Sequence, residues 1–365
     1  MNATPTQTAA QISEGSRISV ELTNVCNLRC SYCFRDEDAL YHTPAQFFPV
    51  ELLRGILRDA RATCGIQTAS FTGGEVTIHP NFTEIVEMIA EEGMRFSFVT
   101  NGWHFDRVYP VLMRHRESLS VVGFSLDGAT RQAHDRWRGE GSFVRLMRGV
   151  ARCYMKGIPF IFKVGVRQDT VPQLQEIALL AARLGARAVH FAHLLPTSSG
   201  AEAELSLSHA ERTAVEQEIA ILTKIFRMEI GMVTGYYNVD AAAPCTALGG
   251  TSCNVDYRGR LSLCCNLSGY RGASGETDVV ADLNQESFSS AYPRLRRLAD
   301  EQMGRRRAAI EQRRAVGAEI DLYTGSPCLF CLQSFGKIPW RGAAGGSRSL
   351  PVLTAVEPGA QTVRA

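Results

Sequence analysis

The stretch that decides the fold of this chain is Thr23-Asn-Val-Cys-Asn-Leu-Arg-Cys-Ser-Tyr-Cys-Phe34. It contains three cysteines, Cys26, Cys30 and Cys33, in the spacing C-x3-C-x2-C. Four cysteine thiolates would complete the coordination of an iron–sulfur cluster. Three thiolates leave one iron without a protein ligand, and an open metal position of this kind can bind and activate a small molecule. The spacing therefore predicts a loop that holds a cluster with one reactive iron.

Around this stretch, apolar segments alternate with amphipathic helical patterns. Six strands are predicted, at Ile18–Leu22, Ala69–Thr72, Phe96–Thr100, Val121–Leu126, Phe160–Val166 and Ala188–Phe191. Apolar strands that alternate with helices indicate a parallel sheet covered by helices. Six such units favour an α/β fold of the partial (β/α)6 barrel type, in which the functional residues lie at the C-terminal ends of the strands.

The composition narrows the classes of function. The 365 residues carry a formal net charge of +2, which predicts neither a nucleic-acid partner nor binding to an anionic membrane surface. No apolar run is long enough to span a bilayer, and residues 1–14 lack the pattern of a signal peptide, so we expect a cytoplasmic protein. In such a protein, clustered cysteines indicate metal binding more often than disulfides. Of the 11 cysteines, Cys64 and Cys153 stand alone and are interpreted as packing residues.

The predicted organisation has five parts. Residues 1–16 are expected to be a disordered N-terminus, 17–200 the partial barrel, and 201–234 a linking helix in which Ser208 caps the N-terminus with Glu211 three residues on. Residues 235–340 are richer in glycine and cysteine, with a hairpin at Val255–Cys264, and predict a smaller cysteine-rich domain. Residues 341–365 are expected to be a disordered tail.

Further motifs follow the predicted strands. Thr72-Gly73-Gly74-Glu75 follows the second strand, and paired glycines allow the backbone to approach a ligand closely. Thr100-Asn101-Gly102 ends the third strand, Ser125-Leu126-Asp127-Gly128 ends the fourth, and His134-Asp-Arg-Trp-Arg138-Gly139 comes next. In this order after C-x3-C-x2-C, these motifs resemble the radical S-adenosylmethionine (SAM) superfamily.

The resemblance implies roles for individual residues at a SAM site. Cys26, Cys30 and Cys33 would hold the cluster. The motif Gly73-Gly74-Glu75 would contact the amino group of SAM, near the strand end at Asn101. Ser125 would bind the ribose or the carboxylate, and the backbone around Leu195 would lie near the adenosine. Arg138 is expected to pair with the SAM carboxylate, because a guanidinium can donate two parallel hydrogen bonds to it. A surface ion pair is the alternative interpretation of Arg138.

The remaining six cysteines form a second group. They are Cys245, Cys253, Cys264, Cys265, Cys328 and Cys331, and their pattern is similar to the auxiliary-cluster domains named SPASM and twitch. Because no cysteine follows Cys331, the chain resembles the shorter twitch form with one auxiliary [4Fe–4S] cluster. The favoured ligands are Cys245, Cys264, Cys328 and Cys331, with Cys253 as the alternative. A zinc site stays open as well, because C-x2-C pairs bind zinc.

The resemblance also implies a reaction. Reductive cleavage of SAM would give a 5′-deoxyadenosyl radical that abstracts a substrate hydrogen, with electrons from an external donor of the flavodoxin or ferredoxin type. An auxiliary cluster suits oxidative cross-linking of a ribosomally made peptide. Dehydrogenation or epimerisation of a small molecule such as a sugar or cyclitol is the alternative, and a non-catalytic zinc-binding scaffold is the alternative of another class. Lys163, His190 and His193 would contact substrate if they point into the barrel.

Overall fold

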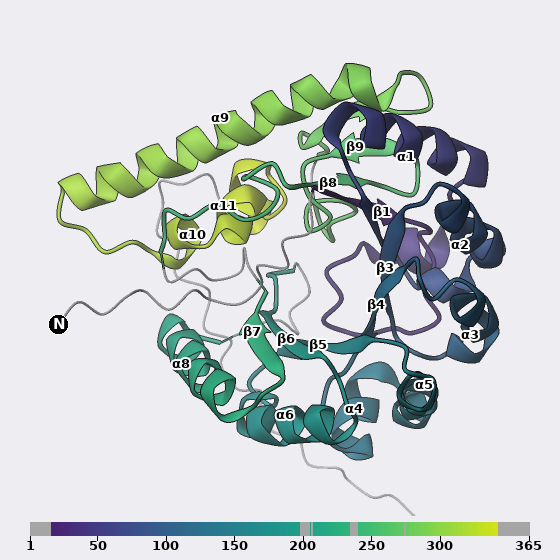
Figure 1. The fold of residues 1–365 in the computed structure, drawn as a ribbon. Coiled ribbons are helices and arrows are strands. Elements are labelled where there is room, and N and C mark those ends of the chain that lie inside the picture. The colour runs from purple at the N-terminus through teal and green to yellow at the C-terminus, as the bar shows by residue number, and fades with distance from the viewer. Residues whose placement is uncertain (1–15, 198–204, 206, 234–239, 274, 342–365) are drawn as a thin grey trace, which may run out of the picture.

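The part of the chain that the structure describes forms one curved ten-stranded sheet with helices around its outside (Figure 1). The structure is a computed structural model, and it describes residues 16–197, 205, 207–233, 240–273 and 275–341. The strand order is β10-β9-β8-β1-β2-β3-β4-β5-β6-β7, and neighbouring strands from β8 through β1 to β7 are parallel. This arrangement confirms the predicted α/β class and partial barrel.

The strands are β1 Arg17–Glu21, β2 Thr68–Thr72, β3 Arg95–Thr100, β4 Leu119–Ser125, β5 Phe160–Val166, β6 Ala188–His193, β7 Glu229–Met232, β8 Ser252–Val255, β9 Arg260–Ser262 and β10 Val279–Asp282. The α-helices are α1 Val50–Cys64, α2 Phe82–Glu91, α3 Phe105–Arg114, α4 Arg131–Arg138, α5 Ser142–Lys156, α6 Leu174–Arg183, α8 His209–Ile225, α9 Phe288–Ala315, α10 Leu322–Gly325 and α11 Pro327–Ser334. Short helical turns lie at Asp38–His42, Val76–Ile78, Val171–Gln173 and Pro339–Arg341.

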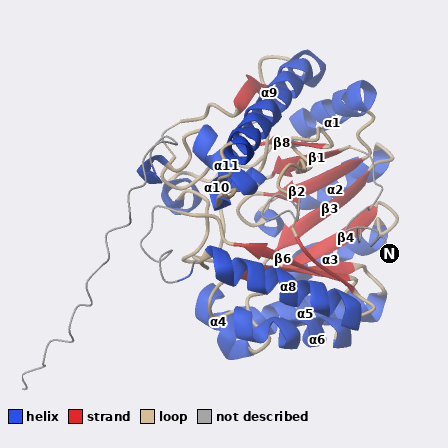
Figure 2. Ribbon diagram, turned by 90° about the vertical axis from the view of Figure 1, so that its left-hand side faces the viewer, coloured by secondary structure: helices blue, strands red, loops and turns tan. Residues whose placement is uncertain are grey.

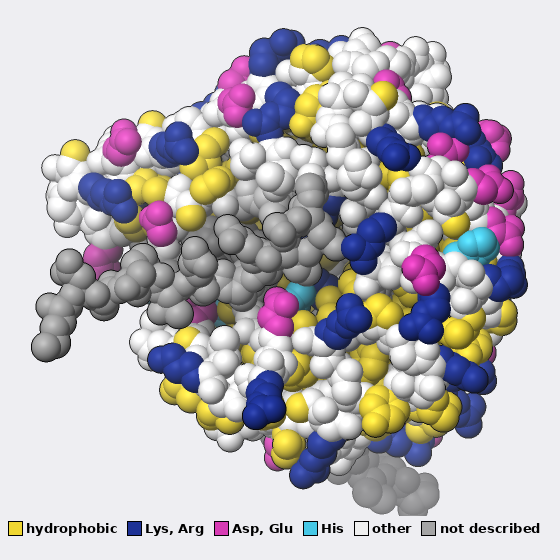
Figure 3. All heavy atoms as spheres, viewed as in Figure 1, with side chains coloured by type: hydrophobic (Ala, Val, Ile, Leu, Met, Phe, Trp, Pro, Cys, Tyr) yellow, Lys and Arg dark blue, Asp and Glu magenta, His cyan; other side chains and the backbone are white. Residues whose placement is uncertain are grey.

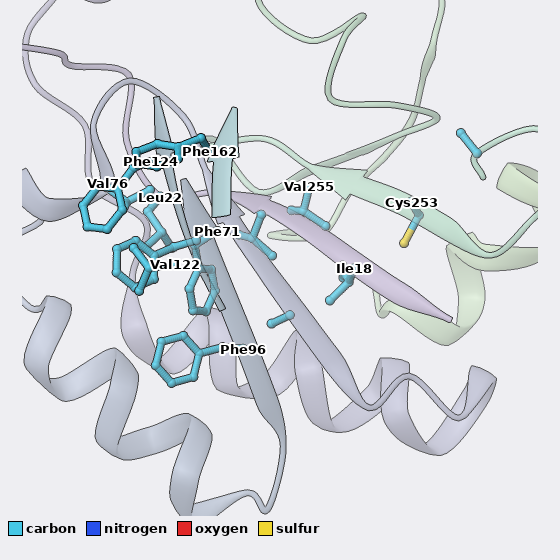
Figure 4. Packing of buried hydrophobic residues seen from close by; sticks show 14 of the residues in the cluster. Ile18, Leu22, Phe71, Val76, Phe96, Val122, Phe124, Phe162, Cys253 and Val255 are labelled. Carbon is cyan, nitrogen blue, oxygen red and sulfur yellow. The ribbon is translucent and has the colours of Figure 1, made fainter. Parts of the chain in front are cut away.

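The two faces of the barrel sheet differ in chemistry. Side chains alternate between the faces of a strand, so every second residue points outward to the helices. The outward positions hold large buried residues such as Phe71, Phe96, Phe124 and Phe162, which pack into one core (Figure 4). The inward positions are smaller and more polar. The lumen is therefore lined by groups that can meet a polar ligand. The helices lie along the outside of the strands (Figure 2).

The predicted linking helix is part of the barrel. It is α8, and Ser208 and Glu211 form the expected capping box at its start. A strand that the sequence did not predict, β7, follows it and pairs with β6 in parallel. Only four residues long and interrupted by Gly231, β7 carries too weak a pattern to stand out. The barrel thus has one more strand than the six expected.

The cysteine-rich region extends the same sheet. Strand β8 pairs in parallel with β1, and β9 returns antiparallel to it, so the predicted hairpin is present. Helix α9 crosses over this edge of the sheet, and α10 and α11 lie beneath it (Figure 1). The domain limits proposed from the sequence stay predictions. Of the two predicted disordered ends, all but residues 16 and 341 lie outside the described residues.

Basic and acidic side chains are interspersed over the face drawn in Figure 3. No helix of the described part combines the length and apolarity needed to cross a bilayer.

Candidate active site

The loop that carries Cys26, Cys30 and Cys33 forms one wall of a cavity of about 250 Å³. The opposite wall consists of strand ends, since Thr72, Thr100 and Ser125 lie at or near the C-terminal ends of β2, β3 and β4. The cavity is therefore at the edge of the sheet where a barrel of this type is expected to bind its ligands.

The glycine pair holds the cysteine loop against the sheet. Gly74 N–H donates to the Thr23 carbonyl over 2.9 Å, and Glu75 N–H donates to the Val25 carbonyl over 2.8 Å. A Cβ on Gly73 would lie 2.5 Å from the Thr23 oxygen, and one on Gly74 only 1.9 Å from the Val25 oxygen. Gly73 also has φ +130°, which side chains disfavour. Both positions therefore require glycine for the approach of the two backbones.

The Glu75 carboxylate is held by hydrogen bonds from neighbouring residues of the chain. It accepts hydrogen bonds from the Thr77 hydroxyl at 2.6 Å, the Thr100 hydroxyl at 2.7 Å and the Asn101 N–H at 2.7 Å. It is 2% exposed, so it joins the ends of β2 and β3 beneath the cavity. All three residues of the motif line the cavity, and the Glu75 carboxylate also holds the two strand ends together.

Asn101 braces the cysteine loop from the other side. Its side-chain nitrogen donates to Asn27 Oδ1 over 3.0 Å and lies 4.0 Å from the Cys26 sulfur. Burial, with the Glu75 charge adding to it, raises the pKa of the Cys26 thiol to about 12, and burial also raises the pKa of Cys30. Such thiols keep their protons unless a metal replaces them. Cys26 and Cys30 therefore fit metal ligands better than free reactive thiols.

Arg138 lies on the cavity wall within a buried charge network. Its Nε donates to Asp127 Oδ2, and its Nη2 donates to the Tyr32 hydroxyl over 2.8 Å. The Arg138 side chain is 13% exposed, so the surface ion pair considered as an alternative is not what the structure shows. Ser125 and Leu195, the other two residues expected near SAM, also line the cavity.

Arg167 completes this network, and sequence reasoning missed its part in the site. Its Nη1 donates to Asp127 Oδ1 over 2.9 Å, and its guanidinium stacks 4.6 Å from the Trp137 ring. Burial opposes ionisation of Asp127, but the two guanidinium groups outweigh it and hold the Asp127 pKa at about 2. The available signal was an arginine directly after β5, at the functional edge of the sheet.

Four cysteines from distant segments form a second site. Cys245, Cys264, Cys328 and Cys331 line a small second cavity. The Asn266 amide donates to the Cys328 sulfur over 3.6 Å, and the Gln302 amide donates to the Cys331 sulfur over 3.7 Å. Amide donors stabilise the thiolate form that metal ligands need.

The structure does not bring Cys253 to this cavity. Cys253 is the register partner of Ile18 in the β1–β8 pair, is 4% exposed and belongs to the hydrophobic core (Figure 4). Its neighbour in sequence, Asn254, faces the other side of the sheet, toward Glu21. The alternation of β8 therefore turns the Cys253 thiol into the core. Cys265 adjoins Cys264 but is not among the residues that line the cavity.

Among the residues that the structure describes, no three cysteine, histidine or acidic side chains converge closely enough to share one metal ion. Sulfurs around one zinc ion would lie about 3.8 Å apart, because Zn–S bonds are about 2.3 Å long. A four-iron cluster gives each thiolate its own iron and holds the sulfurs further apart.

A single segment connects the two cysteine sites. Beyond Cys264 and Cys265, Gly269 accepts a hydrogen bond from Asp36 N–H, and Arg271 N–H donates to the Phe34 carbonyl, both over 2.8 Å. The rings of Phe34 and Tyr270 lie 5.8 Å apart. Arg35 adds a bond of 2.9 Å to the Ser268 carbonyl and an ion pair with Glu21. The segment 266–273 therefore docks directly on the residues that follow Cys33.

Of the three further candidates for substrate contact, two face the lumen. Lys163 and His190 are inward-facing register partners on β5 and β6. His193 contributes to the cavity wall, but its Nε2 lies 3.6 Å from the Glu216 carboxylate on α8, and burial lowers its pKa to about 3.

The chain belongs to the radical SAM superfamily, whose sequence model matches residues 20–230. A [4Fe–4S] cluster and SAM are accordingly its cofactors.

Among individual proteins, the chain is 26% identical over 172 residues to the antilisterial bacteriocin subtilosin biosynthesis protein AlbA of Bacillus subtilis, covering 47% of this chain and 38% of AlbA. It is 30% identical over 203 residues to the mycofactocin maturase MftC of Mycobacterium ulcerans, covering 53% of this chain and 52% of MftC. The chain thus spans about half or less of the length of these curated relatives.

Two solved structures share the fold at low identity. Streptococcus suis SuiB bound to S-adenosylmethionine superposes with a TM-score of 0.63 and 13% identity, over 77% of this chain and 66% of SuiB. The enzyme anSMEcpe with bound AdoMet superposes with a TM-score of 0.61 and 16% identity, over 79% of this chain and 83% of anSMEcpe.

Proposed function

We propose that this chain is a peptide-modifying radical SAM enzyme with one auxiliary [4Fe–4S] cluster. The observation that carries the proposal is the docking of segment 266–273 on the residues after Cys33. It connects the loop of three thiols to the segment that follows Cys264 of the proposed four-thiol site. An electron left on a substrate between them would have a nearby acceptor, which suits a net oxidation such as cross-linking.

The chain's residues divide the work at the first site. Cys26, Cys30 and Cys33 would hold three of the four irons, and the backbone of Gly73 and Gly74 would approach the amino group of SAM. Arg138, oriented by Asp127, would present its guanidinium to the SAM carboxylate. When bound, these cofactors supply a 5′-deoxyadenosyl radical after one-electron reduction. The polar lumen would hold the substrate close to the C5′ position.

Cys245, Cys264, Cys328 and Cys331 would be the four ligands of the auxiliary cluster. The amides of Asn266 and Gln302 would tune it through their contacts with two of the sulfurs. The reducing electron would come from an external donor of the flavodoxin or ferredoxin type.

The relatives support a peptide substrate. AlbA and MftC are named for the making of a bacteriocin and of mycofactocin, SuiB has been solved with the precursor peptide SuiA, and anSMEcpe with the Cp18Cys peptide. A small-molecule substrate is the second candidate, because a heme synthase of Oleidesulfovibrio alaskensis is 29% identical over 195 residues. The match of residues 20–230 to the radical SAM family supports clusters over the zinc scaffold.

The test is formation of 5′-deoxyadenosine from SAM by the anaerobically reconstituted, reduced protein. We expect activity in the wild type and none in Cys30→Ala, because the cluster would lose one of three ligands. Cys64→Ala is the matched control, since Cys64 lies on α1 away from both cysteine cavities. Undiminished 5′-deoxyadenosine from Cys30→Ala, or uptake of zinc in place of iron by the wild type, would contradict the proposal.

A further inference from the structure

Three titratable side chains form a chain across the barrel lumen. Lys163 Nζ lies 3.3 Å from His190 Nδ1, and His190 Nε2 lies 3.3 Å from Glu229 Oε1. They come from β5, β6 and β7, and the strand register places all three on the same face of the sheet. That face also carries Ser125, the register partner of Lys163, at the cavity wall. Lys163 thus lies beside Ser125 and one layer below Gly165, which also lines the cavity, so the three residues extend from the SAM cavity into the lumen.

The hydrogen bonds define the protonation of His190. Burial, followed by the charge of Lys163, lowers the His190 pKa to about 4, so its imidazole is neutral near pH 7. A neutral imidazole has one donor and one acceptor nitrogen. Nδ1 accepts from the Lys163 ammonium, so Nε2–H is left to donate to Glu229. This fixes the direction of one ammonium N–H, and within the described part of the chain the other two have no acceptor and can meet a ligand.

Lys163 has no carboxylate in direct contact among the described residues. The charged or titratable groups that face it are His190, Glu229 beyond it, Arg17 from β1 and Cys265 from the loop after β9. Burial, with the charge of Arg17 adding to it, lowers the pKa of Lys163 to about 8. The Lys163 side chain is half-buried. Enclosed charges in proteins are normally paired, and no carboxylate of the described residues pairs with this ammonium.

The other lysines differ from Lys163 in this respect. The chain has 4 lysines against 35 arginines. Lys156 and Lys224 are exposed, and Lys337 is buried but paired with Asp278 at 2.7 Å. Lys163 is thus the one lysine among these four that is largely enclosed with no carboxylate in contact.

We propose that Lys163, oriented by His190 and Glu229, binds a carboxylate group of the substrate in the barrel lumen. The inference rests on the proposed function for the existence of a substrate there. In a peptide the carboxylate would come from an acidic side chain or from the C-terminus. An ammonium suits this task because it is a compact charge with several donors. The bound carboxylate would tether the substrate below the SAM cavity, with its reacting carbon toward C5′.

The test measures the titration of Lys163 in the reconstituted protein with SAM. Competitive acetylation with acetic anhydride over a range of pH, read by mass spectrometry, gives a midpoint for each lysine. Lys156, Lys224 and Lys337 are internal controls in the same sample. We expect a midpoint near 8 for Lys163.

Two matched pairs of probes identify the ligand. N-acetyl-glutamate α-amide and N-acetyl-glutamine amide differ only in the side-chain carboxylate, whereas N-acetyl-glycylglycine and its amide differ only in the terminal one. A bound carboxylate favours the ammonium, so the acid of at least one pair should raise the Lys163 midpoint by about one unit or more. The responding pair identifies the source. Equal midpoints with acid and amide in both pairs would overturn the inference.

A variant tests the orienting chain. Glu229→Gln removes the negative charge that favours the Lys163 ammonium, so the midpoint should fall below that of the wild type while Lys156 stays unchanged. An unchanged Lys163 midpoint would show that Glu229 does not act on Lys163 through His190. Because labelling needs no SAM cleavage, 5′-deoxyadenosine measured on the same preparation separates the two proposals. A midpoint shift without 5′-deoxyadenosine refutes the function alone, and the reverse result refutes the lumen site alone.

Discussion

The two cysteine sites are built in opposite ways. The first takes Cys26, Cys30 and Cys33 from one loop of eight residues and places them on the wall of a cavity of about 250 Å³. The second takes four cysteines from segments up to 86 positions apart, Cys245 to Cys331, around a much smaller cavity. The first has room for a second ligand beside the thiols, and the second has little.

This difference teaches how each site depends on the fold. A loop site keeps its thiols together by local chain geometry, and the rest of the fold has to supply only the strand ends on which the loop packs. A site assembled from distant segments exists only when β9, α11 and the segment around Cys245 are all in place. Damage to one ligand should therefore act locally at the first site and more broadly at the second.

The largest expected effect is at the second site. Cys328→Ala should remove about half of the iron of the reconstituted protein, since a cluster that has lost a ligand is not retained there. Cys253→Ala should keep the full iron content and cost only about 1 kcal/mol of unfolding free energy, as for a small core truncation. Iron and sulfide assays together with thermal unfolding of both variants make the measurement. Loss of iron in Cys253→Ala and not in Cys328→Ala would reverse the ligand assignment.

The next effect concerns the charges that support the first site. Asp127 lies between Arg138 and Arg167 with its side chain fully buried, so Asp127→Asn leaves two guanidinium groups without their anion. Removing one partner of a buried ion pair costs about 3–5 kcal/mol. SAM affinity should fall as well, because Arg138 loses the group that orients it. Asp106→Asn is the control, since the Asp106–Arg152 pair is exposed and worth less than about 1 kcal/mol.

The contribution of Asp127 to the free energy of unfolding depends on pH in a defined direction. The Asp127 pKa of about 2 lies below the ordinary value of 3.8, so its stabilising contribution is complete above about pH 4 and is lost as the pH falls from there toward 2. Between pH 7 and 5, the difference in unfolding free energy between wild type and Asp127→Asn should therefore be constant. Urea unfolding at both pH values measures it. A difference that shrinks by pH 5 would show that Asp127 is not held as an ion-paired carboxylate.

The contrast between the sites also explains what the sequence could predict. The C-x3-C-x2-C spacing, the glycine pair and the strand ends at Asn101 and Ser125 are local patterns, and the structure places them around one cavity. The part played by Arg167 depends on packing between β4, β5 and α4, which no local pattern records. The position of Cys253 depends on the register of β8 against β1, because one residue of shift would turn it to the opposite face. Strand β7 was missed because its four residues carry little periodicity.

The smallest expected effect tests whether contact with the end of β2 holds the cysteine loop of the first site in place. Gly74→Ala places a Cβ within 1.9 Å of the Val25 carbonyl oxygen, so the cysteine loop must move away from β2. We expect a loss of about 1–3 kcal/mol, as for other overpacked sites, and a lower affinity for SAM with iron content less affected. Gly55→Ala is the matched control, because Gly55 lies exposed in α1 with nothing within 4 Å of the added Cβ. Alanine there should stabilise the helix by about 0.5–1 kcal/mol. Equal behaviour of the two variants in thermal unfolding and SAM binding would mean that the cysteine loop keeps its geometry without close contact with β2. The sheet would then not be what holds the loop of the first site in place.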